Sequence, residues 1–104
     1  MPQFMISYLG GQQPASSEES QQRYLEYKQW LSSLGDTAVS PANPLKSTTT
    51  IHADGSVVNS SATSMSGFTI IEVDSMNAAL VVARACPFLQ IGGSLEVSEL
   101  IPMS

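Results

Sequence analysis

The sequence has little charge, a single cysteine and no long apolar run. Only 12% of its 104 residues are charged, and four Lys or Arg against nine Asp or Glu give a net charge of −5. Four basic residues are too few to form a positively charged surface along a phosphate backbone. We therefore expect no nucleic-acid partner. The lone cysteine excludes an internal disulfide framework. The longest nearly apolar stretch, residues 78–83, is too short to cross a bilayer, so we expect no membrane partner.

The length and the first residues narrow the class of protein. A chain of 104 residues allows one compact domain, residues 1–104. Residues 1–4 lack the basic flank and apolar run of a signal peptide, which indicates a cytoplasmic protein. One histidine, one cysteine and scattered acidic residues give no metal-ligand spacing. We therefore expect neither a metal nor another cofactor.

Local patterns predict a strand and then a helix in the first third of the chain. Residues 3–9 are apolar at nearly every position and stop at two glycines, which is typical of a buried central strand. The run from Ser16 to Glu19 offers a Ser-x-x-Glu capping box, so a helix should begin near Ser17. Gly35 supplies its left-handed cap.

The middle of the chain predicts a connection and a hairpin. Residues 36–44 hold two prolines and small side chains, which favours a connection over a regular element. Residues 46–52 contain four β-branched residues in a row and predict a strand. Asp54-Gly55 supplies a hairpin turn, and residues 57–58 return on its other side. The serine-rich segment 59–66 is expected to be a mobile loop.

The last third predicts a strand, a second helix and a final strand. The strand covers residues 67–73, Asp74-Ser75 caps a helix that runs to Pro87, and residues 94–101 form the last strand. The order βαββαβ predicts an α+β fold, with a four-stranded antiparallel sheet and both helices on one face. The other face then needs a partner, and the simplest partner is a second copy of the chain.

Several motifs in order resemble the YCII-related domain family. They are the run 67–75, Ala78-Ala79-Leu80, the Cys-Pro-x-Leu turn at 86–89, the segment 92–97 and the closing Glu-x-x-Pro-Met at 99–103. The turn and the closing motif are similar to those of one branch of the family. The resemblance implies a ferredoxin-like protomer and a homodimer, the dimeric α/β barrel, in which two sheets pack face to face around clefts. Some relatives carry a His/Asp pair there, whereas residues 23–27, where that histidine would fall, contain none.

His52 and Asp54 are the candidate catalytic residues. Two residues apart in an extended segment, their side chains share a face, and a histidine oriented by a carboxylate is the usual general base near neutral pH. The alternative is that both simply build the hairpin turn, where Asp-Gly bends well.

Tyr24, Tyr27 and Trp30 are the candidate ligand-binding residues. They recur at helical spacing on one face and are able to line a pocket for a flat apolar ligand. The alternative is an ordinary core stripe. Cys86 stands near a helix C-terminus, where the dipole disfavours a thiolate, which indicates a packed, inert thiol.

The leading interpretation is a small homodimer of unassigned biochemical role, with a cleft for a small organic ligand. One alternative is an enzyme that uses acid–base chemistry at His52 and Asp54, of the isomerase or lyase kind. The other alternative is a non-catalytic sensing or accessory module.

Overall fold

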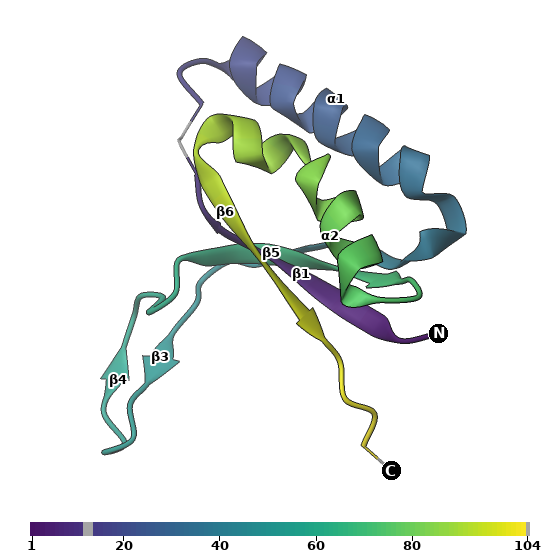
Figure 1. Ribbon diagram of the computed structural model, residues 1–104. Helices are drawn as coiled ribbons and strands as arrows, with labels where there is room; N and C mark the ends of the chain where they lie inside the picture. Colours follow the sequence, from purple (N-terminus) through teal and green to yellow (C-terminus); the bar gives the residue numbers. More distant parts are fainter. Residues whose placement is uncertain (12–13, 104) are drawn as a thin grey trace.

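The computed structural model describes residues 1–11 and 14–103. Two helices lie on one face of a four-stranded antiparallel sheet (Figure 1). The strands of this sheet are β1 (Gln3–Gly10), β2 (Ala38–Pro44), β5 (Met65–Glu72) and β6 (Gly93–Glu99). The helices are α1 (Ser17–Leu34) and α2 (Met76–Arg84), followed by the short 3-10 helices η1 (Gly35–Thr37) and η2 (Pro87–Ile91). No helix within the described ranges is long and apolar enough to span a membrane.

The sheet has the strand order β2-β5-β1-β6, which is compatible with a ferredoxin-like fold. The expectation that the first strand is central is confirmed, because β1 pairs with β5 on one side and β6 on the other. Ile6 stands opposite Thr69 on β5 and Val97 on β6. This register puts Phe4, Ile6 and the residues opposite them on the face that the helices cover.

Both helices begin where the sequence predicts. The Ser16 hydroxyl accepts a hydrogen bond from the Glu19 N–H at 3.1 Å, and the Ser75 hydroxyl accepts one from the Ala78 N–H at 3.1 Å. These side chains satisfy backbone donors that have no partner within the helix. Gly35 ends α1 with a positive φ of 54°, a conformation that favours glycine.

The predicted strand pair in the middle of the chain is wrong in position. The sheet strand is β2, Ala38–Pro44, in the segment that its prolines marked as a connection. An edge strand donates hydrogen bonds on one side only, so it tolerates proline, and the pairing of β2 with β5 shifts register between Ser40 and Asn43. The predicted strand 46–52 shrinks to β3 (Thr50–Ile51), which pairs with β4 (Val57–Val58) across the predicted Asp54-Gly55 turn.

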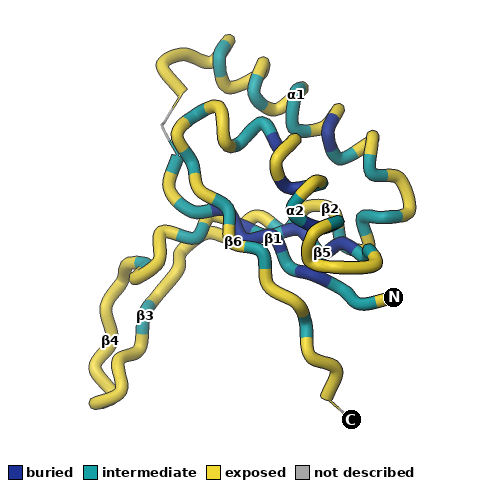
Figure 2. Tube along the Cα trace, viewed as in Figure 1, coloured by how far each residue is buried: buried dark blue, intermediate teal, exposed yellow. Residues whose placement is uncertain are grey.

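The core lies between the sheet and the two helices. Stretches of buried residues are dark blue along the strands and the helices in Figure 2. The buried apolar residues of the core are Phe4, Ile6, Tyr8, Trp30, Ile71, Ala79, Ala83 and Cys86. The Trp30 indole N–H donates a hydrogen bond to the Val82 carbonyl at 3.3 Å, which joins α1 to α2.

The opposite face of the sheet carries apolar side chains and no helix. We call it the helix-free face; its apolar members are Met5, Leu9, Phe68 and Ile70, which alternate with the core residues and are half-buried. The β3–β4 hairpin (the arm, residues 50–58) and the C-terminal residues 100–103 (the tail) both project on this side (Figure 1). They raise the radius of gyration to 15.0 Å, against about 13 Å for a compact chain of this length.

Candidate tyrosine pocket

Three aromatic rings from three elements meet beside the sheet. Tyr8 comes from β1, Tyr27 from α1 and Phe88 from η2. The Tyr8 and Tyr27 rings meet edge to face with centroids 5.7 Å apart, and the Phe88 ring lies 5.4 Å from that of Tyr8. Edge-to-face rings are a favourable aromatic packing. The three rings therefore form a rigid wall between the first helix and the central strand.

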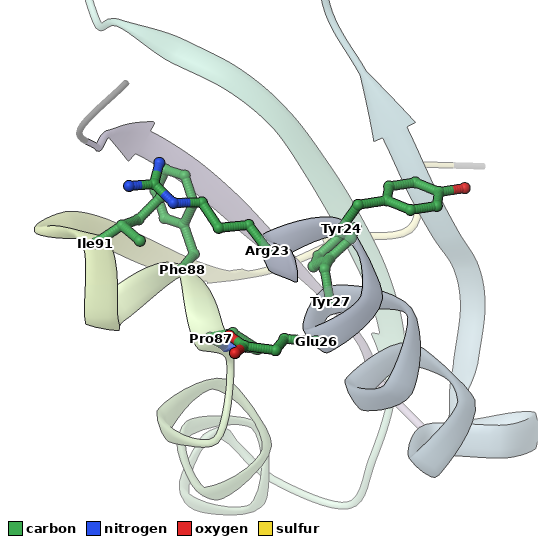
Figure 3. A pocket seen from close by; sticks show the side chains of 7 residues that line it. All are labelled: Arg23, Tyr24, Glu26, Tyr27, Pro87, Phe88 and Ile91. Atoms are coloured by element: carbon green, nitrogen blue, oxygen red, sulfur yellow. The ribbon is translucent and has the colours of Figure 1, made fainter. Parts of the chain in front are cut away.

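Two neighbouring pockets share Tyr24, Tyr27 and Phe88. The larger, with a volume of about 330 Å³, is the tyrosine pocket; its lining consists of Tyr8, Tyr24, Tyr27, Ala42, Asn43, Pro44, Ser66, Gly67 and Phe88. None of these residues carries a charge. The smaller, of about 220 Å³, lies between residues of α1 and of η2 (Figure 3); its lining consists of Arg23, Tyr24, Glu26, Tyr27, Pro87, Phe88 and Ile91.

Gly67 determines how closely β5 approaches the edge strand at the tyrosine pocket. A Cβ at this position would lie 2.9 Å from the Asn43 carbonyl oxygen, closer than real Cβ atoms approach backbone. A larger residue would therefore push β2 away from β5 and open the pocket wall.

A chain of hydroxyl groups runs from the pocket into the sheet. The Tyr27 hydroxyl donates to the Tyr8 hydroxyl at 2.9 Å. Tyr8 is hydrogen-bonded to the Thr69 hydroxyl, which donates to the Pro41 carbonyl at 2.6 Å. Burial raises the pKa of Tyr8 well above its usual range, so the phenol stays neutral at physiological pH.

The predicted ligand-binding residues separate into two groups. Tyr24 and Tyr27 line both pockets, although Tyr24 is largely exposed and points away from Phe88 (Figure 3). Trp30 is buried in the core, 5.9 Å from the Tyr27 ring, and lines neither pocket. Ligand binding by these residues stays a prediction.

His52 and Asp54 lie at the exposed end of the arm, which extends away from α1, the helix that carries Tyr24 and Tyr27 (Figure 1). The Asp54 carboxylate accepts hydrogen bonds from the Ser56 hydroxyl at 2.7 Å and the Ser56 N–H at 2.9 Å. These bonds lower the pKa of Asp54. The backbone of His52 bonds to Ser56 and Gly55, so both residues take part in the turn. Their catalytic role stays a prediction.

Cys86 is the one thiol of the chain and lies in the core. Burial raises its pKa to about 11, which leaves almost no thiolate at neutral pH. This agrees with a packed, inert thiol. Across residues 1–11 and 14–103, no three His, Cys, Asp or Glu side chains gather in a way that could hold a metal ion.

Sequence reasoning missed Tyr8 and Phe88 as pocket residues, and Thr69 as the hydrogen-bond partner of Tyr8. Tyr8 lies in a strand that is apolar at most positions, and Phe88 follows a proline outside any regular pattern. Tyr8 and Phe88 enter the pocket wall through strand register and the path of η2, which no local pattern shows. A tyrosine in a strand that is otherwise mostly apolar is a usable signal, because its hydroxyl needs a partner when buried.

Comparison with known proteins gives one result. A search of curated proteins finds no match to this sequence. The model of the YCII-related domain family, in contrast, matches residues 3–104, almost the whole length of the chain. The chain belongs to the YCII-related domain family.

Proposed function

We propose that this chain works as a homodimer joined through the helix-free face, and that each protomer binds a small organic ligand in the tyrosine pocket. The family suggests a small protein of unassigned role. The observation that carries the dimer is the uncovered apolar sheet face, flanked by an arm and a tail that extend past it. A cytoplasmic location stays a prediction.

The arm and the tail support a second copy as the partner. Ile51 on the arm is 73% exposed and Ile101 in the tail is 83% exposed. Both elements project beyond the helix-free face, so a sheet packed there would meet them (Figure 1). Packing of a partner against extended apolar segments of this kind removes them from water, which stabilises the complex.

The shape and chemistry of the tyrosine pocket support a small uncharged ligand. A volume of about 330 Å³ is at the lower end for sites that hold organic molecules. Its lining is aromatic and apolar with a few polar groups, which is the usual composition of such sites. A charged ligand would find no opposite charge there to offset its loss of water.

Sedimentation velocity at micromolar concentration tests the dimer. The wild-type chain should sediment as a dimer, and Ile70→Lys, which puts a charge in the middle of the helix-free face, should shift it to monomer. Val81→Lys is the matched control, because Val81 is exposed on α2 and away from the sheet. A monomeric wild type, or equal dissociation by both variants, contradicts the proposal.

Ligand-observed NMR with indene, an uncharged bicyclic hydrocarbon, tests the pocket. Indene should bind with one site per protomer. The variant Ala42→Trp should block binding by filling the pocket, whereas Ala62→Trp, at an exposed position outside the pocket, should not. No binding to the wild type, or equal binding by both variants, contradicts the pocket.

The enzyme alternative receives no added support from the geometry. His52 and Asp54 are both exposed on the arm, which by itself encloses no substrate. An isomerase-like or lyase-like activity at these residues and a sensing or accessory role both stay predictions.

A further inference from the structure

We propose that the tyrosine pocket selects uncharged, planar ligands that donate a hydrogen bond over ligands that can only accept one. The inference rests on the proposed function of this pocket and names the chemistry that it recognises. It comes from the direction in which the hydroxyl groups of Tyr27, Tyr8 and Thr69 donate their hydrogen bonds.

The Pro41 carbonyl sets this direction. A carbonyl oxygen can only accept, so the Thr69 hydroxyl gives its one proton to Pro41, 2.6 Å away. Thr69 must then accept in its contact with the Tyr8 hydroxyl, which makes Tyr8 the donor. Tyr8 has no second proton, so it accepts from the Tyr27 hydroxyl at 2.9 Å. The protons therefore point from Tyr27 toward the sheet.

Tyr27 lines the pocket and is the first member of this series of hydroxyl groups, so the series ends there in an acceptor. The Tyr27 hydroxyl has one proton, which it donates to the Tyr8 hydroxyl at 2.9 Å; the Thr69 hydroxyl, at 3.4 Å, is the more distant acceptor. The lone pairs that remain on its oxygen accept a hydrogen bond from a ligand. A ligand with only a carbonyl or ether oxygen would meet another acceptor at this position.

The other polar side chains of the pocket wall offer no competing donor. The Asn43 amide donates to the Ser40 carbonyl, the Ser40 hydroxyl and the Phe68 carbonyl, at 2.9 to 3.3 Å. The Ser66 hydroxyl donates to the Tyr8 carbonyl at 3.4 Å. Tyr24 is 61% exposed, so water competes with a ligand for its hydroxyl. The interior of the pocket thus presents acceptors and aromatic rings.

Three bicyclic compounds of similar size separate the two hydrogen-bonding roles. Indole only donates, 1-indanone only accepts, and indene does neither. Calorimetric titration of the wild-type protein should give indole an affinity about 5-fold higher than indene, the effect of one neutral hydrogen bond. It should give 1-indanone an affinity no higher than that of indene, because its carbonyl loses water without gaining a donor.

Removal of single hydroxyl groups assigns the effect to its atom. Tyr27→Phe should abolish the advantage of indole over indene while the ring stays in the pocket wall. Ser94→Ala, which removes a hydroxyl at an exposed position outside the pocket, should keep that advantage. Thr69→Val removes the hydrogen bond to the Pro41 carbonyl that fixes the direction of donation. The tyrosine hydroxyl groups can then donate in the opposite direction, so the advantage of indole over 1-indanone should shrink or invert.

Each remaining outcome counts against a particular claim. If 1-indanone binds the wild type as tightly as indole, or if Tyr27→Phe keeps the advantage of indole, the inference is overturned while the binding of indene still supports the pocket. If none of the three compounds binds, the pocket itself is overturned and the inference with it.

Discussion

The hydroxyl of Tyr27 on α1 lies 2.9 Å from that of Tyr8 on β1, and this contact ties the first helix to the centre of the sheet. Through Thr69 and Pro41 the same series of hydrogen bonds reaches the edge strand β2. Buried hydroxyl groups need such partners, since an unpaired one loses its water without compensation. One set of hydrogen bonds therefore supports the fold and shapes the pocket.

Trp30→Ala should be among the most damaging single changes. Trp30 is buried between α1 and α2 and donates to the Val82 carbonyl, so its loss leaves a cavity and removes a hydrogen bond between the two helices. We expect the free energy of unfolding to fall by about 3–5 kcal/mol. Urea titration followed by circular dichroism, at one protein concentration, measures it.

Tyr24→Ala is the control for this prediction. Tyr24 is 61% exposed on the same helix, so its removal should change the free energy of unfolding by no more than about 0.5 kcal/mol. Similar losses in both variants would show that Trp30 is not part of the core.

Gly93→Ala should destabilise the protein through Phe88. A Cβ at Gly93 would overlap the ring atoms of Phe88, which packs against Tyr8. Displacing that ring should lower the free energy of unfolding by about 1–3 kcal/mol. The neighbouring Ser94→Ala, at an exposed position, serves as control.

A double variant tests the cause of that loss. Gly93→Ala combined with Phe88→Leu should be destabilised by less than the sum of the two single changes, because the smaller side chain leaves room for the methyl group. If the losses of unfolding free energy in the two single variants add up in the double variant, the effect of Gly93→Ala does not come from its contact with Phe88.

Cys86 should react slowly with thiol reagents in the folded protein. Burial blocks access and raises the pKa of the thiol to about 11, so at pH 8 the reactive thiolate is scarce. Addition of urea should speed the reaction strongly. Labelling of the native chain as fast as that of a free thiol would contradict the buried placement.

Stability should fall as the pH rises above about 9. Burial raises the pKa of Cys86 from 9.0 to about 11 and raises that of Tyr8 as well. Between these values the unfolded chain releases protons that the folded chain keeps, so the free energy of unfolding decreases with pH. Urea titrations between pH 8 and 11 measure the slope.

Cys86→Ala should make that slope shallower from pH 9 upward, because it removes one of the two groups. An unchanged slope would show that the thiol does not contribute to the alkaline loss of stability.

Local signals predicted most of the elements. The strand of residues 3–9, the two serine caps and the Asp54-Gly55 turn all depend on neighbouring residues, and the structure confirms each of them. The helix at residue 17 needs only Ser16 and Glu19 to begin.

The error at β2 and the missed pocket residues have a common physical origin. Pro41 and Pro44 argue against a strand locally, and only the edge position of β2 in the sheet makes them acceptable. Thr69 meets Pro41 from 28 residues away in the chain, and Tyr8 meets Thr69 from 61. Such contacts follow from sheet register, which the local sequence does not specify.

Isotope-filtered NMR on mixed protomers tests the helix-free face most directly. Half of the chains carry labelled methyl groups and half carry none, so a nuclear Overhauser effect between the two kinds reports a contact between copies. We predict such effects from the methyl groups of Met5 and Ile70. Their absence, or effects only from Val81 and Leu25 on the helices, would contradict a dimer formed through this face.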